Sequence, residues 1–142
     1  MVRRLTFAPS AGVLKQLRAD VRKIARALGA EERTGDNLAL VVDELVNNAI
    51  EHGADYRRQG RDLAVSIELA GDRLRIEFFD EEMPPEAVAE LGRALDATSN
   101  GMPSLESERG RGLFLLSVYL QDLRAEVAKS GGLRLVGHIA RQ

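Results

Sequence analysis

The sequence predicts an α+β protein, built as a two-layer α/β sandwich in which a mixed β-sheet is covered on one face by helices. Two observations predict this fold class. Apolar residues recur every three or four positions in several long stretches, which is typical of amphipathic helices, and they alternate with polar residues in shorter stretches, which is typical of strands. Strands and helices are partly grouped along the chain, and this order favours α+β. We expect a single domain over residues 1–142.

The predicted elements are bounded by recognisable caps and turns. Ser10 is suited to cap the first long helix, and Thr34 or Asp36 is suited to cap the central one. Gly71-Asp72 separates two alternating runs, which predicts an antiparallel hairpin. The expected elements are a strand over 2–7, a helix over 10–28, a central helix ending at 53, strands over 63–69 and 74–78, a short helix over 85–95, a helix beginning at 109–112, and strands over 124–129 and 133–139.

The stretch between the central helix and the hairpin is polar and basic. Arg57, Arg58 and Arg61 surround Gln59-Gly60. Because loops normally run over the surface, the simplest interpretation of these arginines is a solvated loop.

Composition and charge exclude several classes of function. The net charge is −2, so no overall basic field draws the chain to nucleic acid or anionic lipid. The absence of cysteine excludes disulfides and thiolate metal sites, and two histidines argue against a His-rich zinc site. Neither a signal peptide nor an apolar span of roughly 18 residues is recognisable. We expect a cytoplasmic protein without a direct nucleic-acid or membrane partner.

The residues best suited to chemistry lie on the central helix. Its apolar stripe is Leu38, Val41, Val42, Leu45, Val46, Ala49 and Ile50. Beside the stripe, Glu44, Asn48 and His52 follow one another at i, i+4 spacing, which stacks them on consecutive turns. Each also has a structural explanation: Asn48 bonded to a backbone group, Glu44 simply exposed, and His52 as a cation at the helix C-terminus. The helix alone therefore indicates a ligand site without establishing one.

Three further features follow in order. Asp80 ends the second strand of the hairpin, although an aspartate there is by itself more often a turn residue. The loop expected over 96–108 is long for a compact domain and is typical of a lid or binding segment. Gly110-Arg111-Gly112 opens a helix, where glycines let backbone N–H groups approach a phosphate.

Together these motifs resemble the GHKL ATPase superfamily, which has the Bergerat or histidine-kinase-like ATPase fold, and most closely its anti-sigma-factor serine kinases. The family's N box, Glu-x-x-x-Asn-Ala-x-x-His, is matched in full from Glu44 to His52. Its first glycine box, Asp-x-Gly, is matched at Asp80 but has Glu82 in place of glycine. Its second is matched by Gly110-Arg111-Gly112-Leu113. The resemblance covers about residues 5 to 137.

The resemblance implies roles for these residues. Glu44 would be the general base, Asn48 would coordinate a Mg²⁺ ion that bridges the triphosphate, and Asp80 would accept the adenine amino hydrogen. The remaining nucleotide-binding positions are His52, Arg109, Gly110, Arg111, Gly112 and Leu113, where either arginine is suited to reach a phosphate, and residues 99–108 correspond to the ATP lid. Glu82 departs from the family, and its side chain would crowd the adenine and add negative charge.

The function implied by the resemblance is an ATP- and Mg²⁺-dependent serine-protein kinase in a partner-switching system. It would phosphorylate an anti-sigma-factor antagonist, bind that antagonist or a sigma factor, and form a homodimer by family analogy. Glu82 leaves open a binding module that sequesters a partner without chemistry. A third possibility is a histidine-kinase-like catalytic domain acting on a separate protein, since residues 10–28 contain no histidine and no further domains are recognisable.

Overall fold

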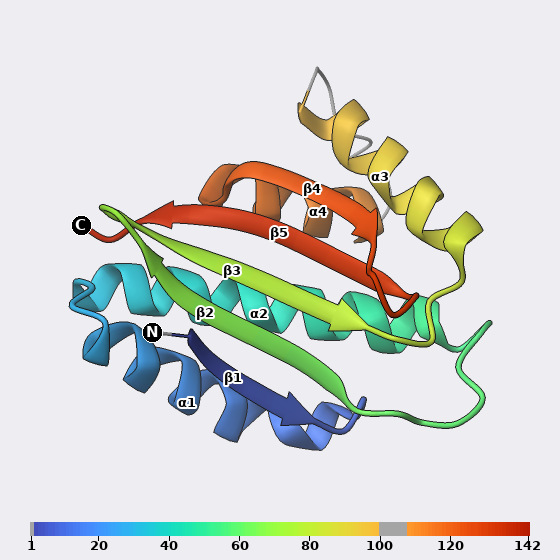
Figure 1. Ribbon diagram of the computed structural model, residues 1–142, viewed down its shortest axis with the longest axis horizontal. Coiled ribbons are helices and arrows are strands. Elements are labelled where there is room, and N and C mark those ends of the chain that lie inside the picture. The colour runs from blue at the N-terminus through green and yellow to red at the C-terminus, as the bar shows by residue number, and fades with distance from the viewer. Residues whose placement is uncertain (1, 100–107) are drawn as a thin grey trace.

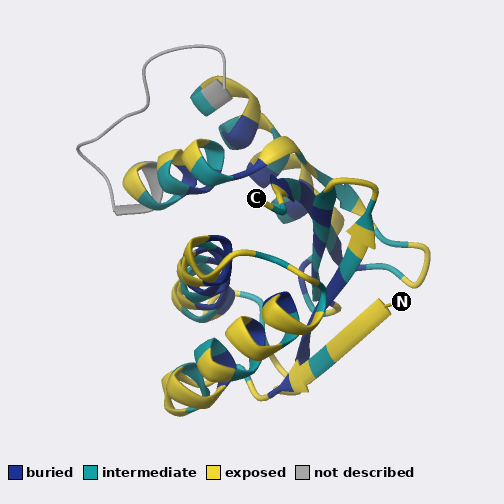
Figure 2. Ribbon diagram, turned by 90° about the vertical axis from the view of Figure 1, so that its left-hand side faces the viewer, coloured by how far each residue is buried: buried dark blue, intermediate teal, exposed yellow. Residues whose placement is uncertain are grey.

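The protein is described here by a computed structural model that covers residues 2–99 and 108–142. A β-sheet forms one layer, and the helices form a second layer on one of its faces (Figure 2). The elements are β1 (Val2–Phe7), a 3₁₀ turn (Ala11–Val13), α1 (Leu14–Ala27), α2 (Glu32–Gly53), β2 (Leu63–Ala70), β3 (Arg73–Asp80), α3 (Pro85–Ser99), α4 (Glu108–Tyr119), β4 (Gln121–Val127) and β5 (Leu133–Ala140). The predicted α+β sandwich is confirmed.

The sheet has the strand order β1-β2-β3-β5-β4 (Figure 1), and every neighbouring pair is antiparallel. The expectation of a mixed sheet was wrong. Between β1 and β2 the chain passes through two helices that run in opposite directions, so it returns to the end of the sheet where β1 stopped (Figure 1). β2 therefore runs back beside β1, whereas a single crossover helix would have made the pair parallel.

Helix α2 lies at the centre of the helical layer, between α1 and α4 (Figure 2). Six of the seven residues of its predicted apolar stripe are buried: Leu38, Val41, Val42 and Val46 have no exposed surface, and Leu45 and Ala49 have almost none. The seventh, Ile50, is half-buried. These side chains share one hydrophobic core with buried residues of the strands, among them Ile67, Ile76 and Leu135. No helix in the described ranges is long and apolar enough to cross a lipid bilayer.

The central helix begins earlier than its sequence suggested. Its first residue is Glu32, and Thr34 and Asp36 lie inside the helix rather than at its cap. The Thr34 hydroxyl is buried and donates to the carbonyl oxygens of Ala140 and Arg141, at 3.4 and 3.1 Å. The Thr34 hydroxyl, which the sequence suggested as a helix cap, therefore forms tertiary hydrogen bonds at the end of β5 instead. Ser10 accepts a hydrogen bond from the N–H of Gly12, but it caps the 3₁₀ turn rather than the long helix: α1 begins at Leu14, and its N-cap residue Val13 forms no side-chain cap.

The bounds of α3 and β4 also differ from those predicted from the sequence. α3 continues to Ser99, so residues 96–99 are helical and not part of a loop. The rest of the expected lid, residues 100–107, lies outside the described residues. β4 begins at Gln121, three residues earlier than expected.

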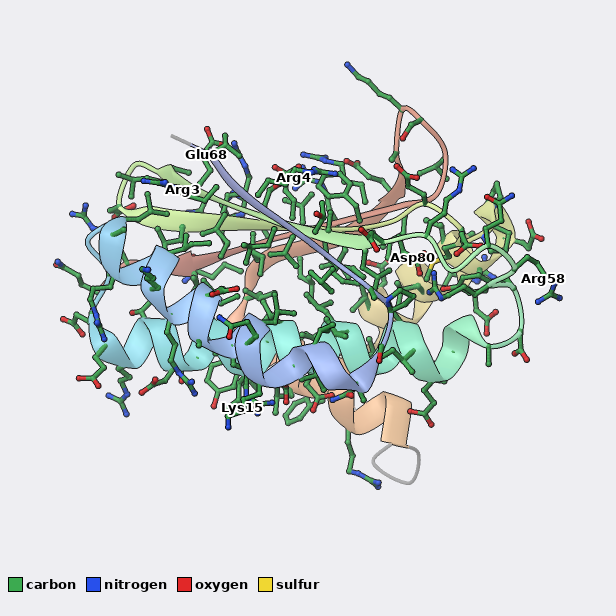
Figure 3. All side chains as sticks on the ribbon, turned by 90° about the horizontal axis from the view of Figure 1, so that it is seen from below. Arg3, Arg4, Lys15, Arg58, Glu68 and Asp80 are labelled. Carbon is green, nitrogen blue, oxygen red and sulfur yellow. The ribbon has the colours of Figure 1, made fainter. Side chains whose placement is uncertain are left out.

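One end of the molecule gathers segments that are distant in sequence. The C-terminal end of α2, the loop that follows it, the end of β3 and the turn between β4 and β5 meet there (Figure 1). Asp80 lies between the sheet and the helices at this end, while Arg58 lies at the periphery (Figure 3). The predicted site residues fall partly at this end and partly along the groove between α2 and α4.

Candidate functional site

A cleft of about 510 Å³ lies between α2 and the beginning of α4. From α2 it is lined by Glu44, Asn47, Asn48, Ile50 and Glu51, and from α4 by Arg111, Gly112, Leu113, Leu115 and Leu116. The fold therefore brings together five predicted site residues from two separate motifs: Glu44, Asn48, Arg111, Gly112 and Leu113. Arg109 and Gly110 belong to the first turn of α4, but their side-chain surroundings lie outside the described part of the chain.

The face of α2 that lines the cleft follows helical geometry rather than strict i+4 spacing. Glu44, Asn47, Asn48 and Glu51 are at i, i+3, i+4 and i+7. Each i+4 step advances about 40° beyond a full turn, so His52 has rotated roughly 80° from Glu44 and does not line the cleft. Asn47 and Glu51 were missed by the sequence analysis, although i, i+3, i+4, i+7 spacing would have selected them.

Glu44 is half-buried in the wall of the cleft. Burial raises the pKa of its carboxyl above the ordinary value, and the neighbouring Asp43 carboxylate raises that pKa further. A carboxylate with a raised pKa is a stronger base than an ordinary glutamate, which suits it to accept a proton from a hydroxyl or a water.

Gly112 allows α4 to approach this carboxylate. A Cβ atom at position 112 would lie 2.8 Å from Glu44 Oε2, which is closer than a carbon normally comes to an oxygen. Glu44 is the flexible partner in this contact, so a larger residue at 112 would displace the carboxylate rather than unfold the helix. The glycine therefore determines where Glu44 sits in the cleft.

Asp80 lies outside this cleft and is fully buried. Its Oδ1 accepts hydrogen bonds from Arg57 Nη1 at 3.0 Å and from the N–H of Glu82 at 3.2 Å. Its Oδ2 accepts from Arg57 Nη2 at 2.8 Å and from the Tyr56 hydroxyl at 2.9 Å. We call Tyr56, Arg57, Asp80 and Glu82 the Asp80 clasp.

Arg57 is the buried cation of the Asp80 clasp, with only 11% of its side chain exposed. Its Nη2 also donates to the carbonyl oxygen of Ala49 on α2, at 3.3 Å. The hydrogen bond to Asp80 holds the pKa of the guanidinium above its ordinary value. The interpretation of a solvated loop was therefore wrong for Arg57, because a buried carboxylate 23 residues away requires a cation.

Gly53, the last residue of α2, provides the space for this arginine. A Cβ atom there would lie 2.6 Å from Arg57 Nη2. The backbone carbonyl of Gly53 also accepts from the N–H groups of Tyr56 and Arg57, at 3.1 and 2.7 Å. The end of α2 thus turns sharply and directs Arg57 back toward Asp80.

Glu82 fastens the loop that carries Arg57. Its Oε1 accepts from the N–H groups of Arg58 and Gln59 at 3.0 and 2.7 Å, and its Oε2 accepts from the N–H of Arg61 at 2.9 Å. Arg57 Nη1 adds a longer contact to Glu82 Oε2 at 3.4 Å. These donors, led by the N–H of Gln59, lower the pKa of Glu82 to about 2. The residue that departs from the family motif is therefore a structural anchor.

Sequence reasoning found Asp80 and Glu82 but missed Tyr56 and Arg57 as their partners. One signal was available: three arginines between positions 57 and 61 match three acidic residues between positions 80 and 82. Two stretches of opposite charge can pair across a fold, but only the tertiary structure determines which ions are buried.

The two ends of the site differ in how well they fit a Mg²⁺–nucleotide complex. In the cleft, the Asn48 amide offers an oxygen ligand of the kind Mg²⁺ prefers, and Arg111 and Gly112 line the facing wall. No cluster of three or more His, Asp or Glu side chains suited to a metal occurs among the described residues. At Asp80, both carboxylate oxygens already accept two hydrogen bonds each, so this end does not fit an adenine amino group.

The chain thus has an antiparallel sheet layered with helices, and its Asn-bearing helix α2 faces the glycine-containing helix α4 across a cleft. The chain belongs to the histidine kinase-like ATPase domain family, whose model matches residues 7–136. A chain in the crystal structure of the SiaB–SiaC complex from Pseudomonas aeruginosa shares the fold, with a TM-score of 0.73 and 18% identity. The alignment covers 95% of this chain and 88% of that chain. No curated protein sequence matches this one.

Proposed function

We propose that this chain is an ATP- and Mg²⁺-dependent serine-protein kinase that phosphorylates an anti-sigma-factor antagonist in a partner-switching system. The observation that carries the proposal is the placement of Glu44 and Asn48 side by side on one wall of an open cleft, opposite Gly112. Membership in the histidine kinase-like ATPase domain family supports nucleotide binding in this cleft.

Each residue of the cleft has a distinct part in this proposal. Asn48 would hold Mg²⁺ through its amide oxygen, and Arg111 would bind the phosphate end of the nucleotide. Bound ATP supplies the phosphoryl group. Glu44 would accept the proton of the serine hydroxyl as that oxygen bonds to the γ-phosphorus and the bond from this phosphorus to the bridging oxygen breaks, so that ADP leaves. Its raised pKa suits Glu44 to this task.

The proposed partner is a separate protein. The chain from the SiaB–SiaC structure comes from a complex of two proteins, which supports a protein partner for this fold. We place the kinase in the cytoplasm as a single domain over residues 1–142, with a homodimer as its assembly. An anti-sigma-factor antagonist is the proposed substrate, and a sigma factor is the second proposed partner.

Calorimetry with Asn48→Ala tests the nucleotide site. ATP should bind the wild type only with Mg²⁺, and Asn48→Ala should abolish that dependence. Asn47→Ala is the matched control, because Asn47 is adjacent, exposed and lines the same cleft. Equal loss in both variants would place the metal elsewhere.

Phosphotransfer with Glu44→Gln tests the chemistry. Transfer of labelled phosphate to the antagonist should fall by about 10²–10⁴-fold while ATP binding persists, since a missing general base slows only the chemical step. The absence of any transfer by the wild type, with its correct partner supplied, would refute the kinase proposal.

A second candidate is a binding module of the same fold that sequesters a partner without chemistry. The occupied carboxylate of Asp80 favours it, because the base end of the site is filled by this chain's own side chains. In that case Glu44→Gln would leave regulation in cells unchanged, whereas the kinase proposal expects regulation to be lost.

A further inference from the structure

The carboxylate of Asp80 has no acceptor position left for a donor from outside the chain. An ionised carboxylate offers about four lone-pair directions. Arg57 Nη1, Arg57 Nη2, the Tyr56 hydroxyl and the N–H of Glu82 together supply four hydrogen bonds at 2.8–3.2 Å. A base amino group must therefore displace one of these donors before it can bind Asp80.

We propose that Arg57 is an internal ligand of Asp80 that takes the place of a nucleotide base. With the Asp80 clasp closed, the site binds nucleoside triphosphates through their phosphates and does not distinguish adenine by its amino group. This inference rests on the nucleotide binding proposed above and specifies which part of the nucleotide the chain recognises.

The chemistry of the competing donors favours Arg57 over a base. The guanidinium forms two charge-assisted hydrogen bonds in a planar fork, whereas the adenine amino group is neutral and offers one. The Asp80 side chain has no exposed surface, so exchanging Arg57 for a neutral base would leave a buried carboxylate without its counter-charge. Arg57 also belongs to the same chain, four residues after the end of α2, which keeps its local concentration high.

Glu82 determines whether Arg57 is able to leave. Its carboxylate binds the N–H groups of Arg58, Gln59 and Arg61, so the loop on both sides of the turn is tied to the end of β3. Removing the Glu82 side chain frees this loop and removes the contact from Arg57 Nη1 to Glu82, which leaves Asp80 and the carbonyl of Ala49 as the partners of the guanidinium. Glu82→Gly therefore makes it easier for a nucleotide base to displace Arg57, without replacing Asp80 itself.

The test compares the binding of ATP with that of inosine triphosphate, whose base has a carbonyl where adenine has its amino group. Calorimetry in Mg²⁺ should give wild-type dissociation constants within about twofold of each other, since Asp80 does not contact the base. In Glu82→Gly, ATP should bind at least about tenfold more tightly than inosine triphosphate, because a hydrogen bond to a charged acceptor is gained.

Two further variants keep the result interpretable if Glu82→Gly folds poorly. Arg57→Lys retains a positive charge for Asp80 but loses the bidentate fork, so it too should gain a preference for ATP. Arg58→Ala is the control, because among the described residues the Arg58 side chain donates only to the carbonyls of Asp55 and Arg57. The nucleotide preference of this variant should match that of the wild type. Circular dichroism establishes folding for each variant.

A second readout follows Arg57 directly. Adenosine, which lacks phosphates, should leave the guanidinium ¹⁵N–¹H signals of Arg57 unchanged in the wild type and shift them in Glu82→Gly. A tenfold preference for ATP in the wild type would overturn the inference, because it would show Asp80 open to the base. Equal binding of both nucleotides by the opened variants would also overturn it while leaving the kinase proposal intact. Phosphotransfer to the antagonist tests that proposal separately.

Discussion

The two ends of the site use polar side chains in opposite ways. In the cleft, Glu44 and Asn48 are half-exposed, and none of the described residues forms a hydrogen bond with either side chain. In the Asp80 clasp, the carboxylate is fully buried and accepts four hydrogen bonds, and both terminal nitrogens of the largely buried Arg57 guanidinium donate to it. Polar groups left open to a cleft remain available to a ligand, whereas buried and paired groups fix the backbone around them. The cleft therefore offers polar groups to a ligand, whereas the Asp80 clasp holds the surrounding backbone in place.

This comparison predicts that changes in the Asp80 clasp reduce stability and that changes in the cleft reduce activity. The largest expected effect is that of Arg57→Ala, which leaves Asp80 buried without a cation. The free energy of unfolding should fall by about 3–5 kcal/mol. Urea denaturation checks this, with Arg58→Ala as the control, since changes at exposed positions usually stay within about 0.5 kcal/mol. Similar losses in both variants would show that Asp80 does not depend on Arg57.

Gly132→Ala should be the next most severe change. Gly132 has φ +77°, and a Cβ there would lie 2.6 Å from both the carbonyl oxygen of Asp80 and Cα of Glu81. Strain and backbone collision together should cost about 3 kcal/mol or more. Gly131 also has a positive φ but open space around it, so Gly131→Ala should cost only about 1–2 kcal/mol. Equal thermal unfolding of the two variants would contradict close packing of this turn on Asp80.

Glu82→Gln should lower the free energy of unfolding by an intermediate amount, and this amount should depend on pH. The folded-state pKa of Glu82 is lowered from 4.5 to about 2, so its stabilisation is complete above about pH 4.5 and is lost as the pH falls toward 2. At pH 7 the variant should lose about 1–3 kcal/mol, because the hydrogen bonds no longer involve a charged acceptor.

The difference between wild type and Glu82→Gln should narrow between pH 4.5 and 2, as measured by urea denaturation at several pH values. Glu81→Gln is the control at pH 7, because that carboxylate is exposed and, within the described ranges, pairs only with Arg61. A difference that stays constant down to pH 2 would rule out an ionised Glu82 as the anchor of the loop.

Gly112→Ala should have the smallest effect on stability, within about 1 kcal/mol, because alanine favours a helix and only the flexible Glu44 carboxylate must move. Phosphotransfer should nevertheless fall, since Glu44 is displaced. Gly92→Ala in α3 is the control, because its Cβ would meet only the carbonyl oxygen of Ala125 at 3.7 Å. Full activity in Gly112→Ala would show that the position of Glu44 is not critical.

The sequence by itself determined the fold class and half of the residues that line the cleft. Periodicity placed the stripe of α2 and the β2–β3 hairpin, since helix and strand periods are local properties of the chain. Glu44, Asn48 and Gly112 were selected from motif spacing, and the fold brings them to one cleft. His52 was selected by the same spacing, but helical rotation carries it away from that cleft.

Only the tertiary structure decided the partners of residues whose contacts are distant in sequence. Thr34 contacts the end of β5 instead of capping α2. Arg57, which was expected in a solvated loop, binds Asp80. The strand directions likewise depended on the path through α1 and α2, which made the sheet wholly antiparallel. Local sequence sets periodicity and propensity, but the pairing of buried polar groups depends on which segments the completed fold brings within hydrogen-bonding distance.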